Sequence, residues 1–168
     1  MQNFSRPHRN LQTVFALVLL TGTATASLPV AAQNAASQDA ASQDCWDKAT
    51  SQGAMTACGL SELDKAEMEM NALYAIMLDK VRGDADTVRK IRKAQEAWRA
   101  FRAAHAEAVF PKADTQAGAR AEYGSSFPMC WAAVNMELTE QRIAQLREWV
   151  DGIPEGDVCA GSRGFPGN

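Results

Sequence analysis

Apolar residues recur at helical spacing along a first long stretch, from Ser51 to Val81. They are mostly three or four positions apart: Met55, Leu63, Ala66, Met70, Leu73, Met77 and Val81. Ser51 suits an N-cap and Gly83 ends the helix. Ser61 with Asp64 offers a second start, so Gly59 marks either a break or only a weak point.

Two further stretches predict helices. One runs from about Thr87 to Phe110, is capped by Asp84 or Asp86 and stops at Pro111. Its inward positions are Val88, Ile91, Trp98, Phe101, His105 and Val109, and its mostly solvated basic residues are Arg89, Lys90, Arg92, Lys93 and Arg99. The other runs from about Pro128 to Val150 and ends at residues 152–154. Its inward residues are Val134, Leu138, Leu146 and Val150.

No stretch alternates apolar and polar residues as a strand does. We therefore predict an all-α fold, a small up-down bundle of three main helices with an optional short helix at its front. Residues 112–127 form a loop that is long enough to have a role of its own. Residues 33–44 are Ala, Ser, Gln and Asp, which is typical of a disordered leader.

The first 32 residues have the pattern of a secretory signal peptide. Arg6 and Arg9 precede a short apolar run, and residues 30–32 form an A-x-A-like cleavage site. The run is shorter than the ~20 residues that span a bilayer, although an uncleaved anchor is the alternative. We place cleavage after Ala32, with Ala26 as a second choice, and expect a periplasmic or secreted protein without a membrane span after cleavage.

Charge and cysteine content narrow the function further. Removing Arg6 and Arg9 from 17 basic residues leaves 15 against 20 acidic ones, a net charge near −5. Such a domain is a poor partner for nucleic acid and a reasonable one for a cationic protein. The four cysteines of an exported chain indicate two disulfides. The helical domain then covers residues 45–152, and a disulfide ties down the tail, residues 153–168.

Nothing in the chain favours an enzyme. His105 is the one histidine after the signal peptide, and its position on an apolar helix side is typical of a core residue. Paired cysteines leave no thiol nucleophile. No residues are spaced as metal ligands or as a phosphate-binding glycine loop, so we expect no catalytic residues, no metal and no cofactor.

Four segments of the chain form a recognisable series of motifs. They contain Ser51, Gln52, Met55 and Cys58; then Glu69, Asn71 and Tyr74; then the stretch from Ala94 to Arg102; and finally Leu138, Thr139, Arg142 and Leu146. In this order they resemble the motifs of the LprI-like lysozyme-inhibitor family. The resemblance covers about residues 45–149. It implies a non-enzymatic envelope protein whose partner is a lysozyme.

The resemblance also suggests how the cysteines pair. The family's first pair corresponds to Cys45 with Cys58, whereas Ala106 and Val134 stand where many members carry a second pair. Cys130 and Cys159 are then extra, and the simplest pairing joins them to each other. That bond requires the tail to run back along the last helix. The crossed alternative is Cys58–Cys130 with Cys45–Cys159.

The family motifs meet in space if the first two helices are antiparallel. Positions whose numbers sum to about 169 then face each other, which places Glu69 within reach of Arg102 or Arg99. One interpretation is a register-fixing polar network with a Glu69–Arg102 ion pair. The other is a binding surface. The network residues are Glu69, Asn71, Tyr74, Gln95, Trp98, Arg102 and Arg142.

A different segment suits the inhibition of a lysozyme. The cleft of such an enzyme holds two catalytic carboxylates, which a protruding loop with hydroxyl or basic groups could fill. The candidate residues in the loop 112–127 are Arg120, Tyr123, Ser125 and Ser126, although an ordinary surface connection is the simpler interpretation. The rival function is a structural or stress-related envelope protein that binds another periplasmic component, and an uncharacterised hydrolase ranks third.

Overall fold

The computed structural model describes residues 40–164, and every regular element among them is a helix. A short helical segment covers residues 40–48. It is followed by α2 (Gln52–Lys80), α3 (Ala85–Val109), α4 (Gln116–Tyr123) and α5 (Phe127–Val150). The predicted all-α class is confirmed. The predicted signal peptide, residues 1–32, lies outside the described residues.

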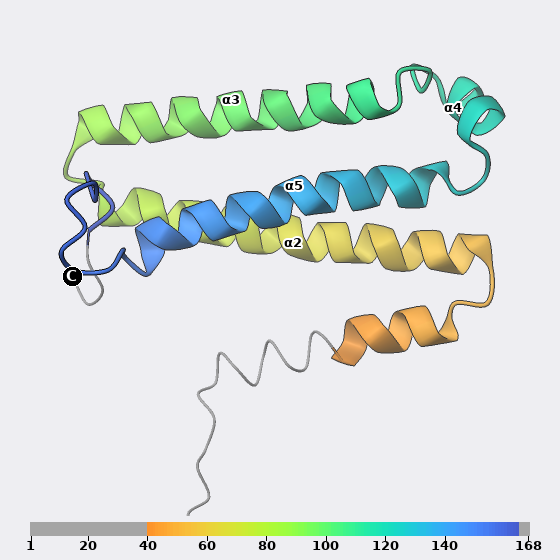
Figure 1. Ribbon diagram of the computed structural model, residues 1–168, viewed down its shortest axis with the longest axis horizontal. Helices are drawn as coiled ribbons and strands as arrows, with labels where there is room; N and C mark the ends of the chain where they lie inside the picture. The colour runs from red at the N-terminus through yellow and green to blue at the C-terminus, as the bar shows by residue number, and fades with distance from the viewer. Residues whose placement is uncertain (1–39, 165–168) are drawn as a thin grey trace, which may run out of the picture.

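The three long helices lie side by side (Figure 1). α2 and α5 run in the same direction and approach each other most closely, whereas α3 runs the opposite way and its backbone stands farther from both. α4 connects α3 to α5 at one end of the molecule. The tail after α5 lies at the other end, beside the turn between α2 and α3 (Figure 1).

The apolar core lies between the helices towards the α2–α3 turn. Its buried members come from α2, α3 and α5: Met70, Met77, Ile91, Ile143 and Leu146. Half-buried aromatic residues, Tyr74, Trp98 and Trp149, pack against this cluster. Removal of these side chains from water is the main favourable contribution to folding.

Side-chain caps set the starts of α2 and α3 where the sequence predicts them. The Ser51 hydroxyl accepts a hydrogen bond from the Ala54 amide, and α2 continues through Gly59, so a break there is wrong. Asp84 caps α3 by accepting from the Asp86 and Thr87 amides. Hydrogen bonds from the Thr87 hydroxyl and amide lower the pKa of Asp84. The cap is therefore charged at neutral pH and weakens as the pH falls through that lowered pKa.

The inward faces of α3 and α5 differ from the predicted ones. α3 buries Ile91, Gln95 and Ala106, while Phe101 and Val109 are 55% and 43% exposed and His105 is exposed beside Phe101. α5 buries Ala132, Asn135, Thr139, Ile143 and Leu146. The predicted core role of His105 is therefore wrong. The inward faces were predicted from apolar residues alone, whereas several of the inward positions carry the polar side chains of Gln95, Asn135 and Thr139.

The helical segment 40–48 packs against the first half of α2. A disulfide joins Cys45 to Cys58, as the resemblance implies. The Trp46 indole lies over Gly59 and donates a hydrogen bond to Glu62. Residues 40–44 therefore belong to a helix and not to a disordered leader.

The second predicted disulfide is absent, because Cys130 and Cys159 are both free thiols. Cys130 lies in the first turn of α5, and the 20 residues from there to Val150 span about 30 Å. The tail does not run back over that length. It turns at the end of α5, where the Ile153 amide donates to the Gly164 carbonyl. The tail is therefore held by backbone hydrogen bonds and by an ion pair between Arg163 and Glu148.

Replacement of both Cys45 and Cys58 by Ser should destabilise the protein. The bond closes a short loop, with a sequence separation of 13, so its loss should lower the free energy of unfolding by about 3 kcal/mol. Urea unfolding measures this loss, and amide hydrogen exchange should show that residues 40–48 lose most protection. An unchanged midpoint would contradict a structural role for the bond.

The purified, oxidised protein should contain two reactive thiols per chain. The exposed Cys159 should react with a maleimide at once, and the half-buried Cys130 should react more slowly. Mass spectrometry after timed labelling counts the thiols. A protein with no labelled thiol before unfolding and reduction would instead support the second disulfide.

Candidate functional site

A layer of polar side chains crosses the middle of the long helices. Gln95 of α3 and both Asn135 and Thr139 of α5 are at least 97% buried, a position that costs free energy unless hydrogen bonds are made. Gln95 Oε1 accepts from Arg142 Nε at 2.9 Å, and the Thr139 hydroxyl donates to the Asn135 carbonyl at 2.7 Å. Among residues 40–164, no buried side-chain nitrogen or oxygen lacks a partner.

Arg102 joins the three long helices at this layer. Its Nη1 donates to the Thr139 hydroxyl on α5 at 2.8 Å and lies 2.7 Å from Glu67 Oε1 on α2. The Arg102 side chain is only 19% exposed, so solvent screens this ion pair less than it screens a surface pair. One guanidinium therefore connects α3 to both of its neighbours.

Trp98 lies between two guanidinium groups. The Cζ atoms of Arg102 and Arg142 are 5.2 Å and 5.9 Å from its ring centroid, within the range of a cation–π interaction. Partial burial lowers the pKa of Arg142, and the nearby Tyr74 opposes that shift. Arg142 remains protonated, because no ordinary shift removes the charge of an arginine.

Two predicted network residues have other partners. Glu69 pairs with Arg147 of α5, so the predicted Glu69–Arg102 pair is wrong. Glu67 and Glu69 are two residues apart and point about 200° apart around the helix, so only one of them can face α3. The predicted register of α2 and α3 is nevertheless nearly correct. Asn71 accepts a hydrogen bond from Arg99 at 3.1 Å, and these two residue numbers sum to 170, against the predicted sum of about 169.

The predicted loop 112–127 contains the short helix α4. The Thr115 hydroxyl caps it by accepting from the Gly118 amide, and Gly124 ends it with a φ of 74°, which favours glycine. These two cap residues are the sequence signal for α4. A Cβ on Gly118 would lie 3.1 Å from the Lys112 carbonyl oxygen, so glycine permits this close approach.

Aromatic rings fix α4 to its neighbours. Phe110 lies edge-on to both Tyr123 and Phe127, with ring centroids 5.3 Å apart in each case. The Tyr123 hydroxyl accepts from the Lys112 amide at 3.1 Å, and Lys112 pairs with Glu122 at 2.6 Å. Tyr123 thus holds the end of the molecule together, in contrast to its predicted role at a binding loop.

Arg120 and Ser125 lie at the surface and line a shallow cavity of about 350 Å³. The start of α2 also lines this cavity, with Gln52, Gly53 and Thr56. Arg120 makes no ion pair with any residue in 40–164. The fourth candidate, Ser126, is half-buried at the start of α5.

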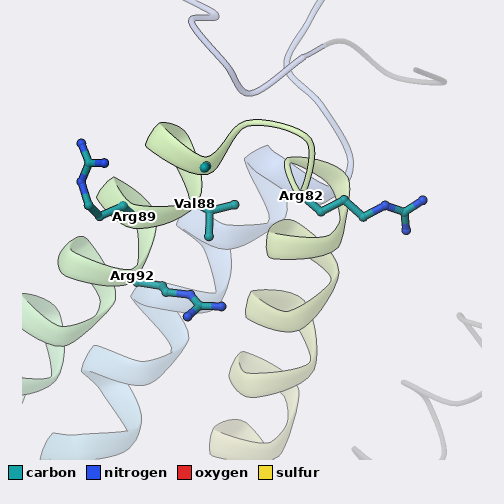
Figure 2. Close-up of a pocket in the computed structure, with 5 residues that line it drawn as sticks. Arg82, Val88, Arg89 and Arg92 are labelled. Carbon is teal, nitrogen blue, oxygen red and sulfur yellow. The ribbon is translucent and has the colours of Figure 1, made fainter.

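A cavity at the opposite end is lined by three arginines, Arg82, Arg89 and Arg92, with Ala85 and Val88. Figure 2 shows that the Arg89 guanidinium extends away from those of Arg82 and Arg92. Arg82, in the turn after α2, forms an ion pair with Asp79, and Arg89 forms one with Asp86 of its own helix α3. These side chains therefore do not converge on a common ligand.

Comparison with known proteins assigns the family. The model of the lysozyme inhibitor LprI family matches residues 45–146 of this chain. The chain belongs to the LprI family. An uncharacterized protein of Rhizobium meliloti (strain 1021) is 30% identical over 115 residues, which cover 62% of this chain and 77% of that protein. No solved structure shows significant similarity to the chain.

The motifs shared with the LprI family lie mainly in the polar layer. The structure brings together Gln95, Trp98, Arg102 and Arg142, with Tyr74 packed beside them. The sequence analysis did not place three further members of the layer there: Glu67, Asn135 and Thr139. Thr139 belongs to a family motif, so helical register from Arg142 could have placed it inward, one turn earlier. The described part of the chain contains no group of three residues able to hold a metal ion.

Thr139→Val should destabilise this LprI domain by about 1–2 kcal/mol, because valine keeps the volume but leaves Arg102 without one acceptor in a buried site. A double-mutant cycle with Arg102→Ala should show coupling of about 0.5 kcal/mol or more. Chemical unfolding measures both quantities. Thr87→Val is unsuitable as a control because the Thr87 hydroxyl donates a hydrogen bond to Asp84. The exposed Glu140→Gln serves as the control instead. Additive effects would contradict the link.

Proposed function

We propose that this LprI-family protein is an exported, non-enzymatic binding protein that inhibits a lysozyme. Family membership supports the class of function. The proposed location is the periplasm or the medium, and it depends on the signal peptide predicted for residues 1–32. Within residues 40–164, none of the helices combines the length and the apolar character needed to cross a membrane.

The cavity beside Arg120 is the observation that carries the proposal. A lysozyme cleft holds two carboxylates, so an inhibitor gains from an unpaired guanidinium that faces them. The start of α2 lines the same cavity, and helix starts favour negative charge. Ser125 adds a hydroxyl at the same surface.

The rigidity of α4 also supports this site. Arg120 lies on a helix that is fixed at both ends by caps, and Tyr123 and Phe127 secure it against α3 and α5. A side chain on such a support loses little conformational freedom when it binds. The polar layer is less suited to binding a partner, because its side chains already bond one another. We therefore assign that layer to the stability of the fold.

Purified protein should protect cell walls from at least one class of lysozyme. Arg120→Ala should weaken the inhibition about tenfold or more, as expected for an arginine at the centre of an interface. Turbidity of a cell-wall suspension, followed at several inhibitor concentrations, gives the inhibition constant for each variant.

Arg92→Ala is the matched control, since Arg92 is also exposed, makes no ion pair within residues 40–164 and lies at the opposite end of the molecule. It should inhibit like the original protein. Equal loss in both variants would refute the α4 site. Absence of inhibition at several-fold excess over every lysozyme class would refute the function and favour the rival envelope role.

A further inference from the structure

A second cavity lies between the end of α3 and the start of α5. Its volume is about 400 Å³. Phe127 lines this cavity, whereas its neighbour Pro128 lines the Arg120 cavity. The two sites are therefore close but separate. The remaining lining residues are Ala103, Ala106, Glu107, Phe110, Ala113, Asp114 and Trp131.

Aromatic rings supply much of the wall. Phe110 and Phe127 meet edge to face, so their mutual arrangement is fixed by packing. Trp131 is 39% exposed, an unusual degree of exposure for the largest apolar side chain. The faces of such rings carry partial negative charge and attract cations.

Glu107 and Asp114 add two full negative charges to the same cavity. Both are exposed, and neither forms an ion pair or a side-chain hydrogen bond with any described residue. Both carboxylates are therefore free to accept hydrogen bonds from a ligand in the cavity.

We propose that this cavity binds an arginine side chain from a basic segment of a partner protein. An apolar occupant would cover two unpaired carboxylates and remove their water, which is costly. A guanidinium group satisfies both features at once, since its plane stacks on aromatic rings and its edge donates to a carboxylate. The site requires only a basic segment and does not require an enzyme cleft, so the inference goes beyond the proposed inhibition.

Titration of the isotope-labelled protein with a short acetylated, amidated Ala-Arg-Ala peptide tests the site. Trp131 has one of the chain's four indole N–H signals, and Trp131→Phe assigns it. We expect that signal to shift in a saturable manner at millimolar peptide. The other three indole signals should move little. The same peptide with citrulline in place of arginine keeps the shape without the charge and should bind at least tenfold more weakly.

The double variant Glu107→Gln, Asp114→Asn should also lose at least tenfold in affinity, with an unchanged melting temperature because neither carboxylate has an internal partner. Glu137→Gln, Glu140→Gln removes two exposed α5 carboxylates elsewhere and should bind normally. Equal binding of the citrulline peptide, or equal loss in both double variants, would overturn the proposal. Binding of spermidine without binding of the arginine peptide would overturn it too. Inhibition of lysozyme by the cavity variant would leave the Arg120 site intact, so the two proposals fail separately.

Discussion

One guanidinium group connects α3 to both of the other long helices at the centre of the domain. α2 and α5 approach each other most closely, whereas the α3 backbone stands farther from both. Arg102 extends across that distance and contacts Glu67 and Thr139 together. The distance is large enough to admit arginine, glutamine and tryptophan side chains, and those side chains in turn keep the helices apart.

This arrangement explains how a polar layer can occupy the centre of a small domain. Buried polar groups are tolerated when every donor and acceptor has a partner. Here Gln95 accepts a hydrogen bond from Arg142. The Thr139 hydroxyl both accepts from Arg102 and donates to the Asn135 carbonyl. Because the partners come from different helices, a slip of one helix along another would leave several of them unsatisfied. The layer therefore fixes the register as well as the spacing.

The layer also determines what the sequence could predict. Helix starts were readable, because Ser51 and Asp84 act locally on the amides that follow them. The inward faces were readable only in part. The antiparallel register placed Gln95 between the helices, but the apolar pattern treats Asn135 and Thr139 as surface residues and turns α3 towards Phe101 and His105. The sequence also could not predict whether Cys130 and Cys159 form a disulfide, because that depends on the direction that the tail takes after α5. In the candidate site, Arg120 and Ser125 are at the surface as expected, while Tyr123 is used to fasten α4.

Two adjacent cavities of opposite charge at the α4 end have a consequence for recognition. The Arg120 cavity favours a carboxylate, and the cavity with Glu107 and Asp114 favours a cation. The first residues of α5 separate them, so a partner that fits both must present its charges at a matching spacing and in one order. A partner in the reverse orientation would place like charges together, which costs several kcal/mol. The two opposite charges, held on a rigid support, thus select both the partner and its orientation. One charged cavity alone would not fix the orientation.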